Sequence, residues 1–525
     1  MELTIIISFR ISIPGGRMPY FLGIDVGTTG SKAVLVDEQG RVVSSHTTEY
    51  PLYTPKVGWT EQLPDEWWTA TVSSIKAVLE KSRVKPDEIQ GVGLTGQMHG
   101  LVMLDRERKV IRPAILWNDQ RTGEETQFIN EKIGLERILT LTGNVAHTGF
   151  TAPKLLWVKK HEPHNFGKMW KFMLPKDYVG FKLTGEVKTD VNDASGTSLF
   201  NVEQRSWSSE IVEELGIPHE ALPDVLESPE VRGEVTSEAS TETGLPKGTI
   251  VVAGAGDQGA AGVGAGVVEE GVVSVNIGTS GVVFTHSSVY RYDPKGRLHA
   301  FCHAVPGSWH LMGVMLSAGG SLRWFRDRLG QLEKGLADLL GVDPYELLCK
   351  EAEHVPPGSE GLIFLPYLTG ERTPHADPYS RGVFFGLSLK HGRQHMVRAI
   401  LEGVCYGLRD SLELILALGV KPKEVRVLGG GARSQLWRQI LSDVYGIDVY
   451  TMEVDEGSSF GAAILASVGV GAYSSVERAV EAMVRKREHV KYSVENNAVY
   501  TRYYRLYKDL YPALKEKFRE LAQIV

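Results

Sequence analysis

A single carboxylate lies inside a glycine-rich stretch near the middle of the chain, residues 254–259 with the sequence GAGDQG. The apolar run 249–253 before it predicts a short buried strand, and the small residues after it predict a closely packed helix start. Open α/β sheets bind ligands at the carboxyl ends of their strands, where this turn would lie. Two kinds of chemistry compete here. The stretch is either a GxGxxG dinucleotide-binding turn, or a turn that presents Asp257 as a general base with glycines leaving space around it.

Two further turns combine glycine with hydroxyl residues. Residues 24–30 (IDVGTTG) and 275–281 (VNIGTSG) share one pattern: apolar, Asp or Asn, apolar, Gly, Thr, hydroxyl, Gly. The backbone N–H groups of such turns can cradle phosphate oxygens, Lys32 can add a point charge, and Asp25 can hold Mg²⁺ through water. The first turn alone fits a plain hairpin with capping threonines equally well. The repeat, however, predicts two domains of similar fold with a nucleotide in the cleft between them.

Three other polar or glycine-rich stretches follow predicted strands. Residues 95–100 (TGQMHG) place His99 and Gln97 in one loop, which favours ligand binding over a structural histidine. Residues 190–196 (DVNDASG) offer several substrate hydrogen-bonding groups, and a solvated turn is an equal alternative. Residues 429–435 (GGGARSQ) would let a flat ligand or a ribose lie against the backbone.

Strands are predicted at 20–25, 33–37 and 42–50, and a helix begins at Pro64. Residues 124–180 are mainly helical by pattern, and a long helical stretch covers 394–418. The tail carries tyrosines on one helical face, which predicts a packing helix rather than a recognition surface: Tyr500, Tyr503, Tyr504, Tyr507 and Tyr511.

The bulk properties narrow the class of protein. A chain of 525 residues is too long for one core, and 42% hydrophobic with 23% charged residues is ordinary globular composition. A net charge of −7 without blocks of like charge argues against nucleic acid or an anionic membrane as partner. Three widely spaced cysteines and no 18-residue apolar run predict a cytoplasmic protein without a membrane span. Residues 1–19 are predicted to be a disordered extension, with Met18 as an alternative start.

Taken together, these turns resemble the FGGY carbohydrate kinases of the actin/Hsp70/sugar-kinase superfamily, from Phe21 to about Leu510. Residues 149–158 resemble the first family signature, and residues 382–402 resemble the second. Within the family, residues 96–100 (GQMHG), 115–119 (ILWND) and 174–178 (LPKDY) are most similar to D-xylulose kinases.

The resemblance implies an α/β fold of two related actin-like (ribonuclease H-like) domains. Each would be a mixed β-sheet with helices, with ATP in the cleft between them. Residues 20–265 would form the first domain, with the sugar site and the first phosphate turn, and residues 266–525 the second, with the nucleotide pocket. The implied reaction is transfer of phosphate from ATP, with Mg²⁺, to the terminal hydroxyl of D-xylulose, giving D-xylulose 5-phosphate. A homodimer is also implied.

Roles carry over from the resemblance residue by residue. Asp257 matches the catalytic base and Asp25 the carboxylate near Mg²⁺. The sugar site would comprise Gln97, Met98, His99, Asp257 and Gln258. The nucleotide site would comprise Thr28, Thr29, Lys32, Thr279, Gly319, Gly430, Gly431 and Gln435.

Two departures keep alternatives open. Gln258 stands where many xylulose kinases have Asn and glycerol kinases have Gln, so gluconate, ribulose or glycerol remain alternative substrates. Gln435 stands where some relatives have Asn, which would alter how adenine is held. A nucleotide-binding protein of the actin/Hsp70 type without sugar transfer is a further alternative. The dinucleotide interpretation is disfavoured, because it places Asp257 beside a pyrophosphate and leaves the repeated turns unexplained.

Overall fold

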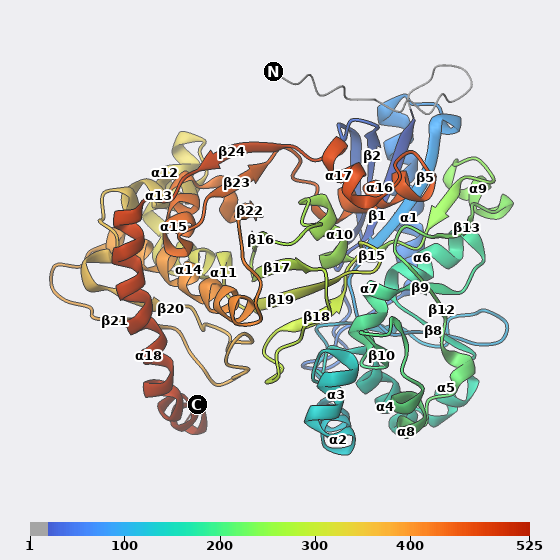
Figure 1. The fold of residues 1–525 in the computed structure, drawn as a ribbon, viewed down its shortest axis with the longest axis horizontal. Helices are drawn as coiled ribbons and strands as arrows, with labels where there is room; N and C mark the ends of the chain where they lie inside the picture. The colour runs from blue at the N-terminus through green and yellow to red at the C-terminus, as the bar shows by residue number, and fades with distance from the viewer. Residues whose placement is uncertain (1–18, 525) are drawn as a thin grey trace.

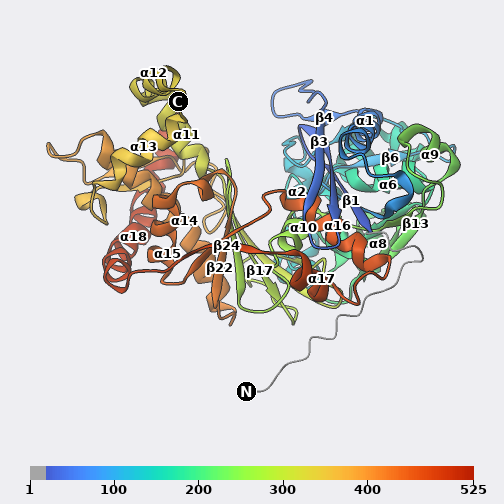
Figure 2. The same ribbon diagram turned by 90° about the horizontal axis from the view of Figure 1, so that it is seen from above.

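The structure is a computed structural model that describes residues 19–524. Of the predicted extension 1–19, residues 1–18 lie outside the described residues. Two α/β bodies lie side by side, the first on the right of Figure 1 and the second on the left, and Figure 2 shows the same arrangement from above. Each body is built around a mixed sheet of seven strands. The mixed sheet in each body agrees with the fold that the family resemblance implied.

The first sheet has a central parallel group flanked by an antiparallel meander. In spatial order its strands are β13 (Val231–Glu234), β14 (Ile250–Val252), β5 (Ile89–Gly96), β1 (Tyr20–Val26), β2 (Gly30–Asp37) and β3 (Val42–Glu49), with β15 (Ala255–Gly256) also pairing with β5. Alternate residues of β1 and β2 enter two different cores, so both faces of the sheet are covered. Helix α1 (Pro64–Ser82) packs with one core and α16 (Gly457–Gly469) with the other.

Six strands of the second sheet repeat this order, and β18 extends the sheet beyond them. Its strands are β24 (Lys486–Val490), β23 (Val449–Met452), β22 (Glu424–Leu428), β16 (Val272–Ile277), β17 (Gly281–Ser287), β19 (Trp309–Met315) and β18 (His299–Cys302). The β16–β22 pair is parallel and the β16–β17 pair antiparallel, matching β1–β5 and β1–β2. The prediction of two related domains from the repeated turns is therefore confirmed.

Helices of the second body cover its sheet around a large apolar core. They are α11 (Gly319–Leu329), α13 (Pro344–Glu353), α14 (Arg393–Ala417), α15 (Gln435–Tyr445) and α18 (Val494–Ile524). Helix α12 (Gln331–Leu340) packs on α11 and α13, and α17 (Val476–Met483) packs with a core of the first body. The short strands β20 (Ile363–Leu365) and β21 (Val383–Phe385) pair with each other. The tyrosines of α18 face this core, so the predicted packing helix is confirmed. No helix within residues 19–524 is long and apolar enough to cross a membrane.

The segment between β5 and β14 adds a mostly helical region to the first body. Its helices are α2 (Gly123–Ile133), α3 (Leu135–Thr142), α4 (Thr151–His161), α5 (Pro163–Lys168), α6 (Pro175–Thr184), α7 (Val191–Ala194), α8 (Ser209–Leu215) and α9 (Ser237–Thr243). Its short strands are β6 (Val102–Leu104), β7 (Ala114–Ile115), β8 (Lys171–Met173), β9 (Lys188–Asp190), β10 (Phe200–Asn201), β11 (Ser206–Trp207) and β12 (Asp224–Leu226), with β4 (Glu61–Gln62) pairing β7.

The alternative of a solvated turn at residues 190–196 is wrong. Asp190 caps α7 by accepting hydrogen bonds from the N–H groups of Asn192 and Asp193, and these side chains are buried. The polar composition of this stretch suggested a solvent-exposed turn, because a buried helix cap and an exposed turn use the same residue types.

Two helices join the bodies at their centre, α10 (Asp257–Gly264) and α16. A Cβ on Gly461 would lie 1.8 Å from the carbonyl oxygen of Ala260, and one on Gly23 would lie 1.9 Å from that of Ser459. Helix α16 therefore packs at backbone contact on both α10 and β1. Although residues 457–469 lie between β23 and β24 of the second sheet in the chain, they pack against the first sheet (Figure 1).

Candidate active site

Three strand ends bring the two carboxylates Asp25 and Asp257 into one region. In the first sheet β5 lies between β1 and β15, and Thr95 of β5 is paired with Asp25 on one side and with Ala255 on the other. Asp257 follows two residues later as the first residue of α10. The carboxyl ends of parallel strands meet at one edge of a sheet, and this places both side chains at that edge.

Asp257 has the properties of a poised base. Burial, together with the negative charge of Asp25, raises the pKa of Asp257 to about 7, while hydrogen bonds from Gln258 act in the opposite direction. A carboxyl group with this pKa is partly ionised at neutral pH and can accept a proton from a hydroxyl group. Gln258 is thus placed beside the base rather than away from it.

The glycines around Asp257 do not leave space for a substrate, contrary to the sequence interpretation. A Cβ on Gly254 would lie 1.9 Å from the carbonyl oxygen of Leu94; one on Gly256 would lie 2.6 Å from Met98 Cγ; and one on Gly259 would lie 2.4 Å from an Asn192 side-chain oxygen. The glycines permit close packing of neighbouring segments. The Gly256 N–H already donates to Asn192 Oδ1, which argues further against the dinucleotide alternative.

Gln97 is committed to the first hydroxyl-rich turn. Its Nε2 donates to the carbonyl of Gly27 at 3.2 Å and to Gln62 Oε1 at 2.9 Å, and its Oε1 accepts from the Thr28 hydroxyl at 3.3 Å. The side chain is 2% exposed. Gln97 therefore braces the turn that carries Thr28, and its place in the sugar site stays a prediction.

His99 and Met98 lie beside the strand end of β5. His99 has a left-handed φ of 68°, and its Nδ1 lies 2.8 Å from the carbonyl oxygen of Gly196. A carbonyl oxygen only accepts, so Nδ1 carries the proton and Nε2 is an acceptor. The ring stacks on Phe150 with centroids 4.4 Å apart, and burial lowers the pKa of His99 to about 3. His99 is thus a neutral acceptor suited to a hydroxyl group.

Two buried residues that the sequence reasoning missed hold the His99 loop and the turn before Asp257. Lys154 Nζ donates to the carbonyls of His99 at 2.8 Å and Gly149 at 2.7 Å, and Lys154 is fully buried. Asn192 Oδ1 accepts from the N–H of Gly256 at 2.9 Å. Lys154 falls within the first family signature, which was the available signal. Nothing local to Asn192 pointed to Gly256, 64 residues away.

Asp25 has a carboxylate oxygen free to hold a cation. Its Oδ2 accepts a 2.5 Å hydrogen bond from the Ser458 hydroxyl, whereas its buried Oδ1 has no hydrogen-bond partner within residues 19–524. Burial raises the pKa of Asp25, and Ser458 and Lys32 oppose that shift. The described residues contain no group of three or more His, Cys, Asp or Glu side chains arranged as metal ligands. A single carboxylate of this kind fits a Mg²⁺ ion carried mainly by nucleotide phosphates.

The first turn is placed differently from the nucleotide residues of the second body. Thr28 accepts from Trp117 Nε1 at 3.0 Å, and Thr29 is exposed. Lys32 pairs with Glu456, the residue before α16. None of Thr28, Thr29 and Lys32 lines the cavity described next.

A cavity of about 700 Å³ opens in the second body between β16, α11, α13 and α15. It is lined by all five of the predicted nucleotide residues of that body: Thr279, Gly319, Gly430, Gly431 and Gln435. A Cβ on Gly430 would meet no atom of the described chain within 4 Å, whereas one on Gly431 would lie 2.4 Å from Ile277 Cγ2. Gly430 thus faces the open space and Gly431 packs on β16.

The walls of this cavity suit a nucleotide. Apolar and aromatic side chains form its sides, namely Ile277, Leu322, Tyr345 and Trp437. Arg323 Nη2 donates to Thr279 Oγ1 at 3.1 Å, so a cation stands beside the second hydroxyl-rich turn. Flat apolar walls with a cation and a phosphate-type turn at one end match a base and its phosphates.

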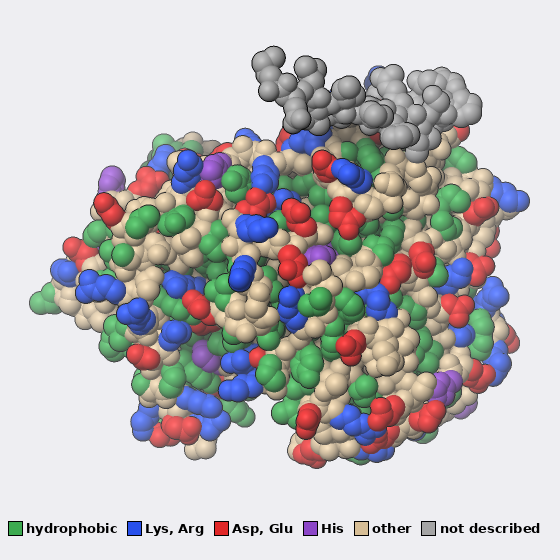
Figure 3. Space-filling view, viewed as in Figure 1, with side chains coloured by type: hydrophobic (Ala, Val, Ile, Leu, Met, Phe, Trp, Pro, Cys, Tyr) green, Lys and Arg blue, Asp and Glu red, His purple; other side chains and the backbone are tan. Residues whose placement is uncertain are grey.

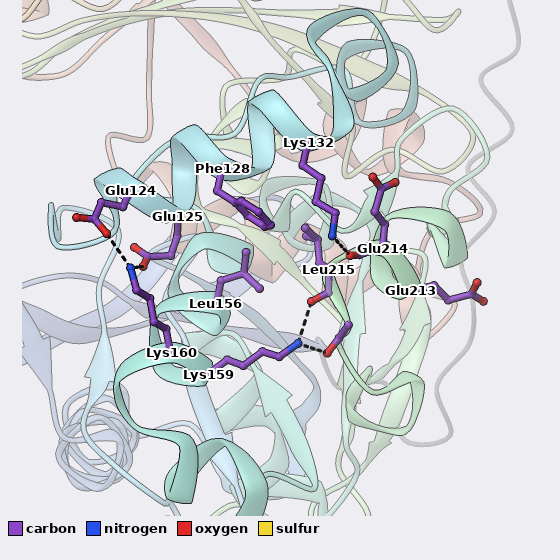
Figure 4. A pocket seen from close by; sticks show the side chains of 11 residues that line it. Glu124, Glu125, Phe128, Lys132, Leu156, Lys159, Lys160, Glu213, Glu214 and Leu215 are labelled. Atoms are coloured by element: carbon purple, nitrogen blue, oxygen red, sulfur yellow. Dashed lines mark hydrogen bonds and ion pairs between the residues drawn. The ribbon is translucent and has the colours of Figure 1, made fainter.

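Another hollow, of about 650 Å³, lies between α2, α4 and α8 (Figure 4). Its ammonium groups are already paired: Lys132 and Lys159 donate to carbonyls at the end of α8, and Lys160 pairs with Glu124. This hollow offers no free cation to an anionic ligand, and we exclude it as the phosphate site.

Family models and known proteins match this arrangement. The model for the N-terminal domain of the FGGY family of carbohydrate kinases matches residues 20–264, and the model for its C-terminal domain matches residues 273–470. The chain is 38% identical over 499 residues to a xylulose kinase of Bacillus subtilis, covering 95% of this chain and 98% of the relative. It is 34% identical to a gluconokinase of Bacillus subtilis, covering 87% and 89%. A crystal structure of xylulose kinase from Rhodospirillum rubrum superposes with a TM-score of 0.88 at 32% identity, covering 95% of this chain and all of that chain.

Proposed function

Because the chain belongs to the FGGY family of carbohydrate kinases, we propose that it transfers the γ-phosphoryl group of ATP to the terminal hydroxyl of D-xylulose. Kinases of this family act on sugars with ATP, and the xylulose kinase relatives match this chain over nearly its whole length. The observation that carries the proposal is Asp257, a half-buried carboxyl with a pKa of about 7 at the carboxyl edge of the first sheet.

Asp257 is the general base. It accepts the proton of the terminal hydroxyl as the hydroxyl oxygen forms a bond to the γ-phosphorus, and the bond from that phosphorus to the bridging oxygen of ADP breaks. The products are D-xylulose 5-phosphate and ADP, with the proton on Asp257. Thr279 and the N–H groups of the two hydroxyl-rich turns stabilise charge on the phosphate oxygens.

The sugar lies against Met98, His99 and Gln258 in this proposal. The acceptor Nε2 of His99 takes a hydrogen bond from a sugar hydroxyl, and Met98 contacts the carbon chain. Gln258 supports the site by donating to Asp257, and Gln97 acts through the first turn. A neutral His99 suits an uncharged polyhydroxy substrate, because an acceptor nitrogen pairs with a hydroxyl group and not with a carboxylate oxygen.

ATP occupies the 700 Å³ cavity of the second body. Asp25, through the free Oδ1, would hold Mg²⁺ together with the nucleotide phosphates. Bound there, the ion would neutralise charge on the phosphate oxygens.

The test is sugar-dependent ADP release measured with D-xylulose, L-ribulose, gluconate and glycerol. We expect D-xylulose to give the highest kcat/KM, by at least about tenfold, which is an increment of about 1.4 kcal/mol in transition-state binding. Preference for gluconate would favour the function of the 34% identical relative. If no sugar raises ADP release above the background ATPase, the kinase proposal fails and an actin/Hsp70-type nucleotide-binding function replaces it.

We also propose a cytoplasmic location, where ATP is available. All three cysteines are buried free thiols, which fits a reducing compartment. On the face shown in Figure 3, acidic and basic side chains are interspersed over both bodies, without a single basic patch for nucleic acid. The homodimer implied by the family resemblance stays a prediction, which light scattering would test.

A further inference from the structure

The first turn of α16 reaches the carboxylate that we assign to the metal ion. Ser458 donates from its hydroxyl to Asp25 Oδ2 at 2.5 Å, and the two residues are 433 positions apart in the chain. Helix α16 follows β23 of the nucleotide-carrying body but packs on β1 of the first body. This hydrogen bond therefore joins the two bodies at Asp25.

We propose that Ser458 is a positioning residue that aims the free oxygen of Asp25 at the metal–nucleotide complex. The inference rests on the proposed function in one respect, that Asp25 holds the metal ion. One oxygen of the carboxylate is committed to Ser458, so rotation of the Asp25 side chain would break a charge-assisted hydrogen bond. The other oxygen, Oδ1, is buried and unpartnered within residues 19–524, which is costly unless a ligand uses it.

The surroundings hold Ser458 in place. Gly23 and Gly461 allow α16 to lie at backbone contact with β1 and α10, as a Cβ on either would overlap a carbonyl oxygen at 1.9 or 1.8 Å. Glu456 pairs with Lys32 of β2, one strand away from Asp25. Two side chains of the same turn thus contact neighbouring strands, so the hydroxyl of Ser458 has little freedom to move.

The geometry distinguishes Ser458 from its neighbour Ser459. The Ser459 hydroxyl donates to the Glu456 carbonyl of its own turn at 2.9 Å and does not contact Asp25. Both serines are in the same turn, and both would lose one hydroxyl on substitution by alanine. Ser459→Ala is therefore a matched control for damage to the turn.

The experiment measures Mn²⁺ binding to the enzyme–ADP complex by electron paramagnetic resonance, without sugar. For Ser458→Ala we expect the Mn²⁺ dissociation constant to rise about tenfold, the typical effect of losing a hydrogen bond to a charged group. Ser458→Thr keeps a hydroxyl and should restore binding to within about twofold, and Ser459→Ala should remain within the same limit. Equal losses in Ser458→Ala and Ser459→Ala, or no loss in Ser458→Ala, would overturn the proposal.

A double-mutant cycle tests whether Ser458 acts through Asp25. We expect Asp25→Asn to weaken Mn²⁺ binding and to abolish the further effect of Ser458→Ala, because the hydroxyl then has no metal-holding carboxylate to position. Additive losses in the double variant would contradict the inference. Binding of Mn²⁺ and ADP requires no sugar turnover, so the result stands apart from the sugar panel. In steady-state assays the positioning role predicts a lower kcat with the KM for D-xylulose unchanged.

Discussion

The two bodies of this protein share one sheet order, but they carry different chemistry at matching positions. Asp25 of β1 is paired with Lys32 and Thr95, whereas its counterpart Asn276 of β16 is paired with Val282 and Leu428. The first body thus presents ionisable and polar groups where the second presents neutral or apolar ones. The fold thus provides two equivalent sheet edges, each formed by the carboxyl ends of strands. The types of side chain at these edges decide that only the first can carry out acid–base chemistry.

The residues that follow the corresponding strands β5 and β22 show the same difference between the two bodies. Gln97 follows β5 two residues past the position of Thr95, and Gly430 follows β22 two residues past Leu428. The Gln97 side chain occupies the space after β5 and donates hydrogen bonds to Gly27 and Gln62. Gly430 has no side chain, and the 700 Å³ cavity lies open beside it. At this matching position, a large side chain supports a turn in the first body, and the lack of a side chain leaves a cavity in the second.

The largest expected effect comes from removing the base of the first body. For Asp257→Ala, kcat should fall about 10³-fold, because no other group accepts the hydroxyl proton. The nucleotide cavity belongs to the second body, so the ADP dissociation constant, measured by calorimetry, should change less than about twofold. A near-normal kcat would remove Asp257 from its role and end the proposed division between the bodies.

The second prediction concerns a substitution that gives the second body the residue type found at the matching position of the first. Gly430→Gln would place a side chain in the open cavity, and the ADP dissociation constant should rise about 100-fold, or about 2.7 kcal/mol. Gly335→Gln on α12 is the matched control, since a Cβ there also meets no atom of the described chain and the residue lies outside the cavity. Unchanged ADP binding in Gly430→Gln would show that the nucleotide lies elsewhere.

The third prediction concerns pH. The active form of Asp257 is ionised, and its pKa is about 7, so kcat/KM should be constant well above pH 7 and fall about tenfold per pH unit well below it. Asp410 of the second body is a buried carboxyl, also with a pKa of about 7, and it accepts from the Tyr504 hydroxyl. Asp410→Asn should leave the pH of half-maximal kcat/KM unchanged. A shift in that pH would mean that Asp410 of the second body, and not Asp257, is the group that titrates.

The smallest effect concerns the ion pair between Lys32 and Glu456, which has no counterpart in the second body because Val282 stands in the register of Lys32. The Lys32 side chain is 33% exposed and that of Glu456 22%, so solvent screens the pair. Glu456→Gln should lower the unfolding free energy by less than about 1 kcal/mol. Glu520→Gln, which removes the partner of the exposed Lys517, is the control and should cause no measurable change in Tm. A loss of several kcal/mol in Glu456→Gln would mean that this pair holds the bodies together.

Much of the fold could be predicted because the decisive signals were local. The repeated turns at Gly27 and Gly278 indicated two related sheets, and the periodic tyrosines of the tail indicated the packing helix. The five nucleotide residues of the second body came from the family resemblance, and they line one cavity.

Other features could not be predicted because they depend on contacts distant in sequence. The sequence suggested open space beside the glycines around Asp257. Met98 occupies that space beside Gly256, and Asn192 occupies it beside Gly259. The polar stretch 190–196 is internal rather than solvated. Composition does not distinguish these cases, because a glycine beside a substrate and a glycine beside another segment are the same residue.

The sequence by itself determined the repeat, the strand-end placement of Asp25 and Asp257, and the resemblance to sugar kinases, since these depend on residue type and short-range pattern. Tertiary structure alone decided which groups meet. It brought Ser458 to Asp25 across 433 residues, packed α16 on the first sheet, and placed Asp257 where the charge of Asp25 acts on it. The physical reason is that a pKa, a free oxygen or an open cavity depends on the neighbours that folding supplies.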